Sequence, residues 1–597
     1  MRWHPGSQIC LLLLMHAVGN VAGLNFTQCL IDIVANANAT QNLAGLLNGN
    51  GDPVSNAFDA TSITYALCTS ACGKGQEPFQ WFVFSQDLGA WLLPNLALIS
   101  QLPFGARYRP DNFMSAALTV GSPVLAGYSL FMTLLNSIWI KRKFDTLKKS
   151  PKTSNSKYAV SILSSLQQVP LRLDPDLVKS LIVLPENDCW LKCLSEFVDY
   201  THTWSFASAA AIIWVVVAFI ISVINTPVEL FVSAEADGTA TGSLWLWLIP
   251  IVVGWLQLSP KCDFYRLEEA YDRANNQHTH TGCAYMGTPI TSTPKALTIT
   301  AEDNDVSSPD ELLTPPVFNY SRSFRWASTA HMMFLEFEAA SKEEARNSTR
   351  VSFPIPIPIP IPIPIQQTES SGTTETLYHT YPPRSSGEIP RDAQCSRWAP
   401  YVWVRVVAAS CVSLALQWGT TGAAFMTAWF TPTTRIGCRS MSYLIYGGVS
   451  TLIWIMLLAS SVLAHYSVQP PFHDTYPASN SYQALSSNRQ QKRLPAGRDL
   501  ARKISNLLRW AGKALAIANS IWVVLACIFV YSNFYDTCFC NGSVFSRGEA
   551  AYSVIIESAA QATQMRTASI IAFVIACASS GLFIVIVNLY RYTRPRL

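Results

Sequence analysis

Seven long apolar stretches most constrain what this chain can fold into. The hydrocarbon core of a bilayer is about 30 Å thick, and a helix that rises about 1.5 Å per residue needs roughly 20 apolar residues to cross it. Stretches that meet or approach this length are residues 115–139, 204–225, 241–258, 401–424, 443–465, 514–531 and 568–590. Only 13% of the 597 residues are charged and 50% are hydrophobic, which is untypical of a soluble domain. The sequence therefore predicts an all-α, polytopic transmembrane helix bundle of about seven spans.

Basic residues are distributed unevenly between the loops that join these stretches. If the N-terminus is outside, the seven crossings leave the loops on that side poor in Lys and Arg and gather most basic residues on the other side. The basic residues on that other side are Lys141, Arg142, Lys143, Lys148, Lys149, Arg489, Lys492, Arg493, Arg498, Arg502, Lys503, Arg509, Arg591, Arg594 and Arg596. Because cytoplasmic loops carry an excess of Lys and Arg, the pattern favours an outside or lumenal N-terminus and a cytosolic C-terminus.

One further apolar stretch, residues 81–102, does not fit this pattern as a span. An eighth crossing would move the basic flanks to the outside, and the stretch contains Asp87, Pro94 and Asn95. An aspartate near the bilayer centre costs about 2.5–3.5 kcal/mol on insertion scales. We therefore expect a re-entrant or interfacial hairpin here. The alternative is a genuine span, with another stretch wrongly assigned.

The N-terminal residues 1–23 are typical of a secretory signal peptide, with Arg2, an apolar core at 9–15 and small residues at 21–23. An uncleaved first anchor is the alternative. Residues 24–80 then form a small extracellular or lumenal segment that can hold disulfides. N-glycosylation is predicted at Asn25, Asn38 and Asn541. The sequons at Asn319 and Asn347 fall in a predicted cytosolic loop and count against the orientation.

Six cysteines fall on the predicted outer side and are consistent with three disulfides. These candidates are Cys29, Cys68, Cys72, Cys438, Cys538 and Cys540. Cys68 and Cys72 can form one short bridge or belong to two bridges, and Cys538 and Cys540 are expected to have distant partners, because so short a loop strains a disulfide. Six cysteines allow fifteen connectivities. Cys411, Cys527 and Cys577 lie in spans, where we expect small apolar packing residues.

The predicted cytosolic parts differ in composition. Residues 81–258 hold the re-entrant stretch, three spans and a segment with two amphipathic helices, around 159–169 and 177–184. Residues 259–398 are rich in Pro, Ser and Thr, and we expect a mostly disordered loop with polyproline II at 354–365 and one helix at 327–344. This loop is a candidate binding site for cytosolic proteins. Residues 399–597 hold four spans and a basic tail.

No catalytic signature is present, so we expect no enzyme activity and assign no catalytic, cofactor or metal residues. His278 and His280, and the pair Cys189 and Cys193, are more typical of chance spacing and helix packing than of a metal site. Arg405 is expected to extend to the headgroups. The formal net charge of +4 is too small to suggest nucleic acid, so the expected non-protein partners are membrane lipids.

Five polar residues fall within the predicted spans, namely Asn136, Gln417, Thr420, Thr421 and Asn519. We expect them to bond neighbouring helices, because an unsatisfied amide in hydrocarbon costs several kcal/mol. A polar cavity lined by Gln417, Thr420 and Thr421, facing Asn519, is the alternative.

Several strings of this sequence resemble those of a group of uncharacterised multi-pass integral membrane proteins of filamentous fungi. They are LALISQLPFGA (96–106), LTVGSPVLAGYSL (118–130), LPENDCW (184–190), WGTTGAA (418–424) and GCRSMSYLIYG (437–447). The resemblance covers the membrane parts and the cytosolic helical segment, and it skips the long loop. It implies a membrane location and a fungal setting, and no activity, ligand or site residue.

Two hypotheses for function remain from the sequence. The first is a non-enzymatic scaffold or sensor of the plasma membrane or a secretory-pathway membrane, with a cytosolic interaction loop. The alternative is a transporter or channel with a polar pathway between its helices.

Overall fold

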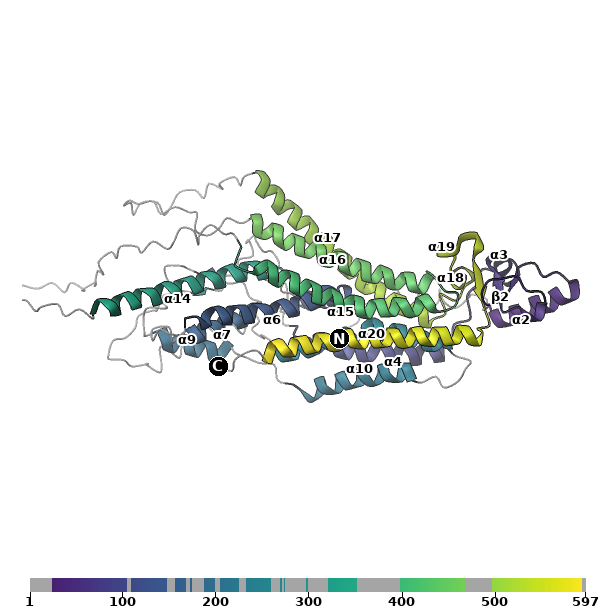
Figure 1. The fold of residues 1–597 in the computed structure, drawn as a ribbon, viewed down its shortest axis with the longest axis horizontal. Helices are drawn as coiled ribbons and strands as arrows, with labels where there is room; N and C mark the ends of the chain where they lie inside the picture. The colour runs from purple at the N-terminus through teal and green to yellow at the C-terminus, as the bar shows by residue number, and fades with distance from the viewer. Residues whose placement is uncertain are drawn as a thin grey trace, which may run out of the picture.

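The computed structural model describes residues 24–104, 109–147, 156–167, 172–173, 187–198, 204–224, 232–258, 269–270, 273, 297–298, 320–351, 398–467 and 496–592. Almost all regular structure in them is helical. Figure 1 shows a long bundle of roughly aligned helices with a small β-containing region at one end and α7, α9 and α14 at the other.

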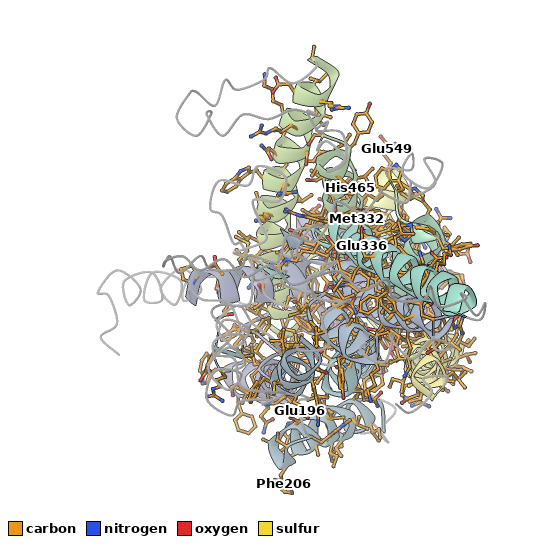
Figure 2. All side chains as sticks on the ribbon, turned by 90° about the vertical axis from the view of Figure 1, so that its left-hand side faces the viewer. Glu196, Phe206, Met332, Glu336, His465 and Glu549 are labelled. Atoms are coloured by element: carbon orange, nitrogen blue, oxygen red, sulfur yellow. A yellow bond between two sulfur atoms is a disulfide. The ribbon has the colours of Figure 1, made fainter. Side chains whose placement is uncertain are left out.

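Six helical segments in the described residues are long and apolar enough to cross a membrane, which confirms the predicted polytopic helix bundle. They are α6 (Pro123–Asp145), the segment Asp237–Leu258 formed by α11 (Val232–Trp245) and α12 (Leu248–Leu258), α15 (Val402–Phe430), α16 (Cys438–Ser467), α17 (Ala496–Tyr531) and α20 (Ala559–Tyr592). The predicted span 204–225 corresponds to α10 (Phe206–Ile224), whose apolar part is shorter than these six. Figure 2, viewed along the bundle, shows Phe206 pointing away from the other helices.

The stretch 81–102 is not the hairpin that the sequence predicted. Residues Trp81–Ile99 form one continuous helix, α4, with Pro94 inside it. The Asn95 side chain donates to the Trp91 carbonyl at 2.9 Å, beside the hydrogen bond that proline removes. The Trp91 ring contacts the rings of Trp245 and Tyr531, so α4 lies along the bundle as a single helix.

The re-entrant turn lies instead between α5 (Arg109–Gly121) and α6, within the stretch 115–139 that was predicted to be one span. Ser122 caps α6 by accepting from the Leu125 amide, and Pro123 starts the helix. Asp111 lies within electrostatic reach of Lys513 and the Gly121 carbonyl accepts from Asn519, so α5 runs in the same direction as α17.

The following helix, α6, runs in the opposite direction to α15. The Val124 amide bonds Gln417 and the Asn136 side chain bonds Arg405, which fixes the antiparallel order. The turn at Ser122 therefore ends deep in the bundle, where it contacts the middle of α15, α16 and α17. Gly121 is required there because a Cβ would collide with the Ala516 carbonyl.

At one end of the bundle, residues 24–80, 431–437 and 532–558 form what we call the disulfide cap. Its elements are α2 (Phe26–Thr40), β1 (Leu46–Leu47), η1 (Ala57–Asp59), β2 (Ser62–Thr64), α3 (Tyr65–Leu67), η2 (Cys68–Cys72), α18 (Cys538–Asn541), α19 (Val544–Arg547), η5 (Gly548–Ala550) and β5 (Tyr552–Val554). Strand β2 pairs antiparallel with both β1 and β5, with Ile63 opposite Leu46 and Ser553. The segment 24–80 is thus not a separate unit, because its sheet includes a strand from the last loop.

At the opposite end, which we call the basic end, α7 (Ser156–Ser165) and α14 (Ser323–Val351) pack against α6, and α9 (Asn187–Val198) packs against α7. A short strand β3 (Arg172–Leu173) pairs with β4 (Leu297–Thr298). Helix α14 contains the helix predicted at 327–344 and extends it at both ends. Its buried side chains recur at helical spacing, and the rings of Phe334 and Phe337 contact Phe144. At the start of α14, the Phe324 ring lies 5.8 Å from the His465 ring of α16.

Helix α7 matches the predicted helix 159–169 but ends earlier, at Ser165. The Trp326 indole donates to the Leu163 carbonyl at 2.9 Å, which joins α14 to α7. The signal peptide 1–23, the helix at 177–184 and the polyproline run at 354–365 lie outside the described residues.

Candidate functional site

Three disulfides among the described residues hold the cap together. They join Cys29 to Cys72, Cys68 to Cys538 and Cys438 to Cys540. These are the six cysteines that the sequence placed on the outer side. Cys68 and Cys72 belong to two different bridges, and Cys538 and Cys540 both have distant partners. The Cys68–Cys538 bridge spans 470 residues and joins the N-terminal segment to the loop before α20.

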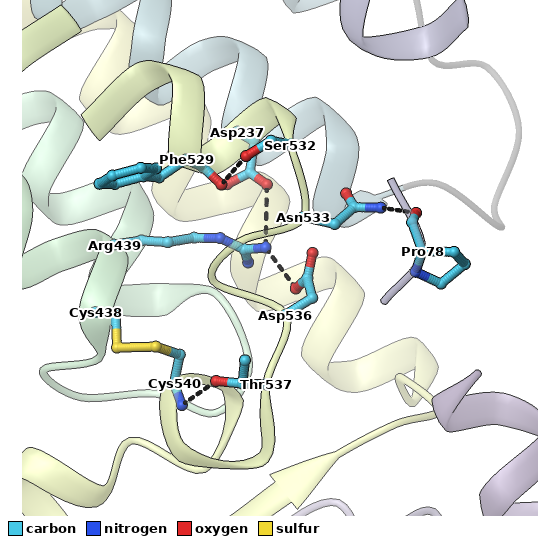
Figure 3. A network of polar contacts seen from close by, with 10 residues as sticks. All are labelled: Pro78, Asp237, Cys438, Arg439, Phe529, Ser532, Asn533, Asp536, Thr537 and Cys540. Carbon is cyan, nitrogen blue, oxygen red and sulfur yellow. Dashed lines mark hydrogen bonds and ion pairs between the residues drawn. A yellow bond between two sulfur atoms is a disulfide. The ribbon is translucent and has the colours of Figure 1, made fainter. Parts of the chain in front are cut away.

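Next to the Cys438–Cys540 bridge, Arg439 at the start of α16 forms the centre of an ion-pair network (Figure 3). Its Nη2 atom lies 2.8 Å from Asp536 Oδ1 and 3.7 Å from Asp237 Oδ2. Close by, the Asn533 side chain donates to the Pro78 carbonyl at 3.3 Å. Sequence reasoning missed Arg439. The sequence signal that could have found Arg439 is its position just before the span 443–465, on the side where Lys and Arg are otherwise few.

Two further carboxyl groups lie near this network. Burial raises the pKa of Glu77, Asp536 raises it further and Arg439 opposes the shift. Burial and Asp237 also raise the pKa of Glu557. Glu77 thus lies within electrostatic reach of Asp536 and Arg439, and Glu557 lies within reach of Asp237.

A small cavity lies beside the Cys438–Cys540 bridge. It is lined by Thr431, Thr433, Arg435, Arg439 and Asn541, among others, and its volume is about 30 Å³. Because one water needs about 10–15 Å³ by this measure, the cavity has room for two or three waters. Pockets that bind small organic ligands are typically about 300–1,000 Å³, so this cavity does not indicate such a ligand.

The three predicted glycosylation residues lie in the cap. Asn25 and Asn38 are exposed, and Asn25 also caps α2 by accepting from the Gln28 amide. Asn541 is half-buried, and the Ser543 hydroxyl of its sequon is buried and donates to the Thr433 carbonyl. Asn347, which counted against the orientation, lies in α14 at the opposite end, and Asn319 is outside the described residues.

The polar span residues Gln417 and Asn519 meet at the turn between α5 and α6. Gln417 Oε1 accepts from the Val124 amide at 3.0 Å and from the Ser450 hydroxyl at 2.6 Å. Asn519 Nδ2 donates to the Gly121 carbonyl at 2.7 Å. These side chains satisfy backbone groups that the helix break exposes, as apolar surroundings require. Their predicted role in bonding neighbouring helices is therefore the one observed.

Other residues that form hydrogen bonds at the turn between α5 and α6 were not predicted from the sequence. Ser122 donates to the Ser450 carbonyl at 2.9 Å, and Tyr446 donates to the Val120 carbonyl at 2.7 Å. The predicted cavity partner Thr420 bonds carbonyls of its own helix instead. Thr421 is buried, and its methyl group lies near Gly447. The four predicted residues therefore do not line a common cavity.

The prediction that Arg405 extends to the headgroups is wrong. The side chain is buried between α15 and α6, where Nη1 donates to Asn136 Oδ1 at 2.5 Å. Its guanidinium carbon lies 4.1 Å from the centroid of the Trp139 ring. An interior amide and an indole face provide a polar partner and a cation–π contact, so the side chain turns inward.

The remaining cysteines divide by position. Cys527 is buried and Cys577 is half-buried, as expected of packing residues, whereas Cys411 is exposed on the outside of α15. Cys193 is half-buried in α9 and packs against the main core. In the part of the chain that the structure describes, no group of three His, Cys, Asp or Glu residues could hold a metal ion. His278 and His280 lie outside it.

Comparisons with protein-family models, with curated proteins and with solved structures find no match to this chain.

Proposed function

We propose that this chain is a non-enzymatic sensor or scaffold of the plasma membrane or a secretory-pathway membrane. In this proposal the disulfide cap faces the outside or the lumen, and the basic end lies in the cytosol. Disulfides form in oxidising compartments, and Lys and Arg are enriched on the cytosolic side of membranes. The segregation of disulfides and basic residues to opposite ends of one bundle supports this orientation.

One helix carries the proposal, because α16 contacts both ends. Its first residue, Cys438, is bridged to Cys540 of the cap, and Arg439 pairs with Asp536. Its 30 residues extend about 45 Å at 1.5 Å per residue. Near its last turn, Ser461 donates to the Tyr320 carbonyl at 2.6 Å, and the His465 ring lies 4.7 Å from that of Trp398.

Both contacts are made by residues of the long segment 259–398. Tyr320 precedes α14, and Trp398 precedes α15. A displacement of α16 at the cap would therefore act directly on the part of the segment that packs against the bundle. In this proposal the segment 259–398 recruits cytosolic proteins, and α16 transmits the state of the cap to it.

The orientation is tested by labelling single cysteines in intact cells with an impermeant thiol reagent. The free thiol of Cys411 is first replaced by serine, because it is exposed. We expect Thr40→Cys in the cap to react from outside, and Thr146→Cys at the end of α6 to react only after permeabilisation. Labelling of Thr146→Cys in intact cells would reverse the proposed orientation.

The coupling is tested by hydrogen exchange of α14 in the purified full chain. Replacing both Cys438 and Cys540 by serine is expected to loosen α16 at the cap and to speed exchange in residues 323–337. The matched control is Cys411→Ser, which removes a thiol without a bridge. Unchanged exchange in α14 would exclude the sensor and leave the scaffold as the proposed function.

A transporter or channel is the second candidate, favoured by the helix break between α5 and α6. Broken helices at membrane depth form the substrate sites of many transporters. The polar groups at this break bond one another and the backbone, which favours a structural role. Ion or solute flux through proteoliposomes that Asn519→Leu abolishes, while the fold is retained, would favour transport over the sensor.

A further inference from the structure

Two cations contact one indole ring at the basic end of the bundle. The guanidinium carbon of Arg405 lies 4.1 Å from the Trp139 ring centroid, and Lys143 Nζ lies 5.3 Å from it. Lys143 Nζ is also 4.6 Å from the Phe334 centroid. Arg405 belongs to α15, Trp139 and Lys143 to α6, and Phe334 to α14, so three helices meet here.

The positive charge of this cluster is poorly compensated. Lys143 is attracted by Glu338 and repelled by Arg405, so only part of the positive charge is balanced. Within the described part of the chain Arg405 has no ion pair, and the nearby acid Glu338 is paired with Lys342 at 2.8 Å. His331 adds no charge at neutral pH, because burial and Lys143 lower its pKa to about 4, and its Nδ1 lies 2.6 Å from Lys143 Nζ.

Buried donors in the cluster are also unsatisfied. Arg405 Nη2 and Asn136 Nδ2 have no hydrogen-bond partner, although Arg405 is only 6% exposed and Asn136 is fully buried. A buried donor without a partner costs about 1–3 kcal/mol, and more when it is charged. The cluster therefore lacks an acceptor that carries negative charge.

We propose that Arg405, Lys143 and Asn136 bind a phosphate group. A phosphate offers several acceptor oxygens and up to two negative charges, which match the two cations and the amide donor. The planar guanidinium of arginine can donate hydrogen bonds to a tetrahedral oxyanion. The bond from Arg405 Nη1 to Asn136 Oδ1 fixes the orientation of this guanidinium. The cluster lies where α6 and α15 reach the membrane boundary, so a lipid headgroup and free phosphate can both supply the group.

The test measures thermal unfolding of the purified full chain in detergent with two probes, inorganic phosphate and a short-chain phosphatidic acid. Both are compared with sodium chloride at equal ionic strength. We expect one or both to raise the melting temperature of the wild type. Stabilisation by phosphatidic acid alone identifies a lipid headgroup, and stabilisation by both shows that phosphate suffices. A lipid retained through purification is detected by native mass spectrometry.

The variants separate this site from general charge attraction. Arg405→Gln should weaken the apparent affinity at least tenfold, and Lys143→Gln, at a half-buried position, should weaken it several-fold. The matched control is Arg142→Gln, which removes an exposed cation from the position before Lys143 in α6. If Arg405→Gln does not fold, Lys143→Gln decides. Absence of stabilisation and of retained lipid in the wild type, or equal binding by Lys143→Gln and Arg142→Gln, would overturn the proposal.

Discussion

The two ends of the bundle are held together by different forces. At the cap, three disulfides that span 43, 102 and 470 residues and a three-stranded sheet join the N-terminal segment to the loop before α20 and to α16. At the basic end, aromatic side chains of α14 pack against α6, as between Phe337 and Phe144, whose ring centroids are 5.5 Å apart. A short polar segment buries too little apolar surface to be stable alone and needs cross-links. An amphipathic helix such as α14, which packs against the long helix α6, needs no cross-link.

Between these ends, the centre of the bundle depends on hydrogen bonds. The break between α5 and α6 leaves the Val124 amide and the Gly121 carbonyl without helical partners, and the side chains of Gln417 and Asn519 bond them. Ser450 in turn donates to Gln417. Covalent links therefore hold the cap, hydrogen bonds hold the centre and apolar packing holds the basic end. Four substitutions test this distinction.

The largest effect is expected at the cap. Replacing Cys68 and Cys538 by serine opens a bridge that spans 470 residues, and by the chain-entropy estimate this costs about 6 kcal/mol. We expect residues 24–80 to become sensitive to protease while α14 remains protected. Cys411→Ser is the control. Equal loss of protection at both ends would mean that the two regions unfold as one unit.

At the basic end, Phe337→Ala should destabilise the docking of α14 by about 3 kcal/mol, because a fully buried ring is removed. Hydrogen exchange in residues 323–337 should increase, with the cap unaffected. Ala339→Ser, at an exposed position of the same helix, serves as the control. Unchanged exchange in α14 would contradict the packing described above.

At the centre, Gln417→Leu should destabilise the bundle by about 2 kcal/mol, since it leaves the Val124 amide and the Ser450 hydroxyl without their acceptor. Thr420→Val is the matched control, because the Thr420 hydroxyl bonds only its own helix. Thermal unfolding in detergent measures both. A smaller loss for Gln417→Leu than for Thr420→Val would exclude a role for Gln417 in stabilising the break.

The smallest effect concerns pH at the cap. Burial raises the pKa of Glu77 above its ordinary value of 4.5, so the folded cap binds this proton more tightly than the unfolded chain does. The resulting stability is complete below about pH 4.5 and is lost as pH rises through the raised pKa. Glu77→Gln should therefore raise the melting temperature at neutral pH and have little effect below about pH 4.5. Asp59→Asn, at an exposed cap position, is the control, and a variant with the wild-type pH profile would contradict this assignment.

The fold class could be predicted because apolar length and helical spacing are local properties. The stretches at 401–424, 443–465 and 514–531 correspond to the long helices α15, α16 and α17. Helix α15 extends past 424, α16 extends at both ends, and α17 starts well before 514. The central part of helix α14 was predicted at 327–344, but its contact with α6 was not. The hairpin at 81–102 was predicted from Asp87 and Pro94, and a single proline proved compatible with one continuous helix.

The sequence by itself determined that this chain forms apolar helices, that its basic residues and six of its cysteines separate along it, and that no catalytic motif organises them. These follow from composition and from spacing within one segment. Only the tertiary structure decided that Arg405 turns inward, that Cys68 pairs with Cys538, and that Gln417 and Asn519 close a helix break at Ser122. The physical reason is that each of these depends on a partner supplied by a distant segment, and no local pattern records which partner the packed bundle brings within reach.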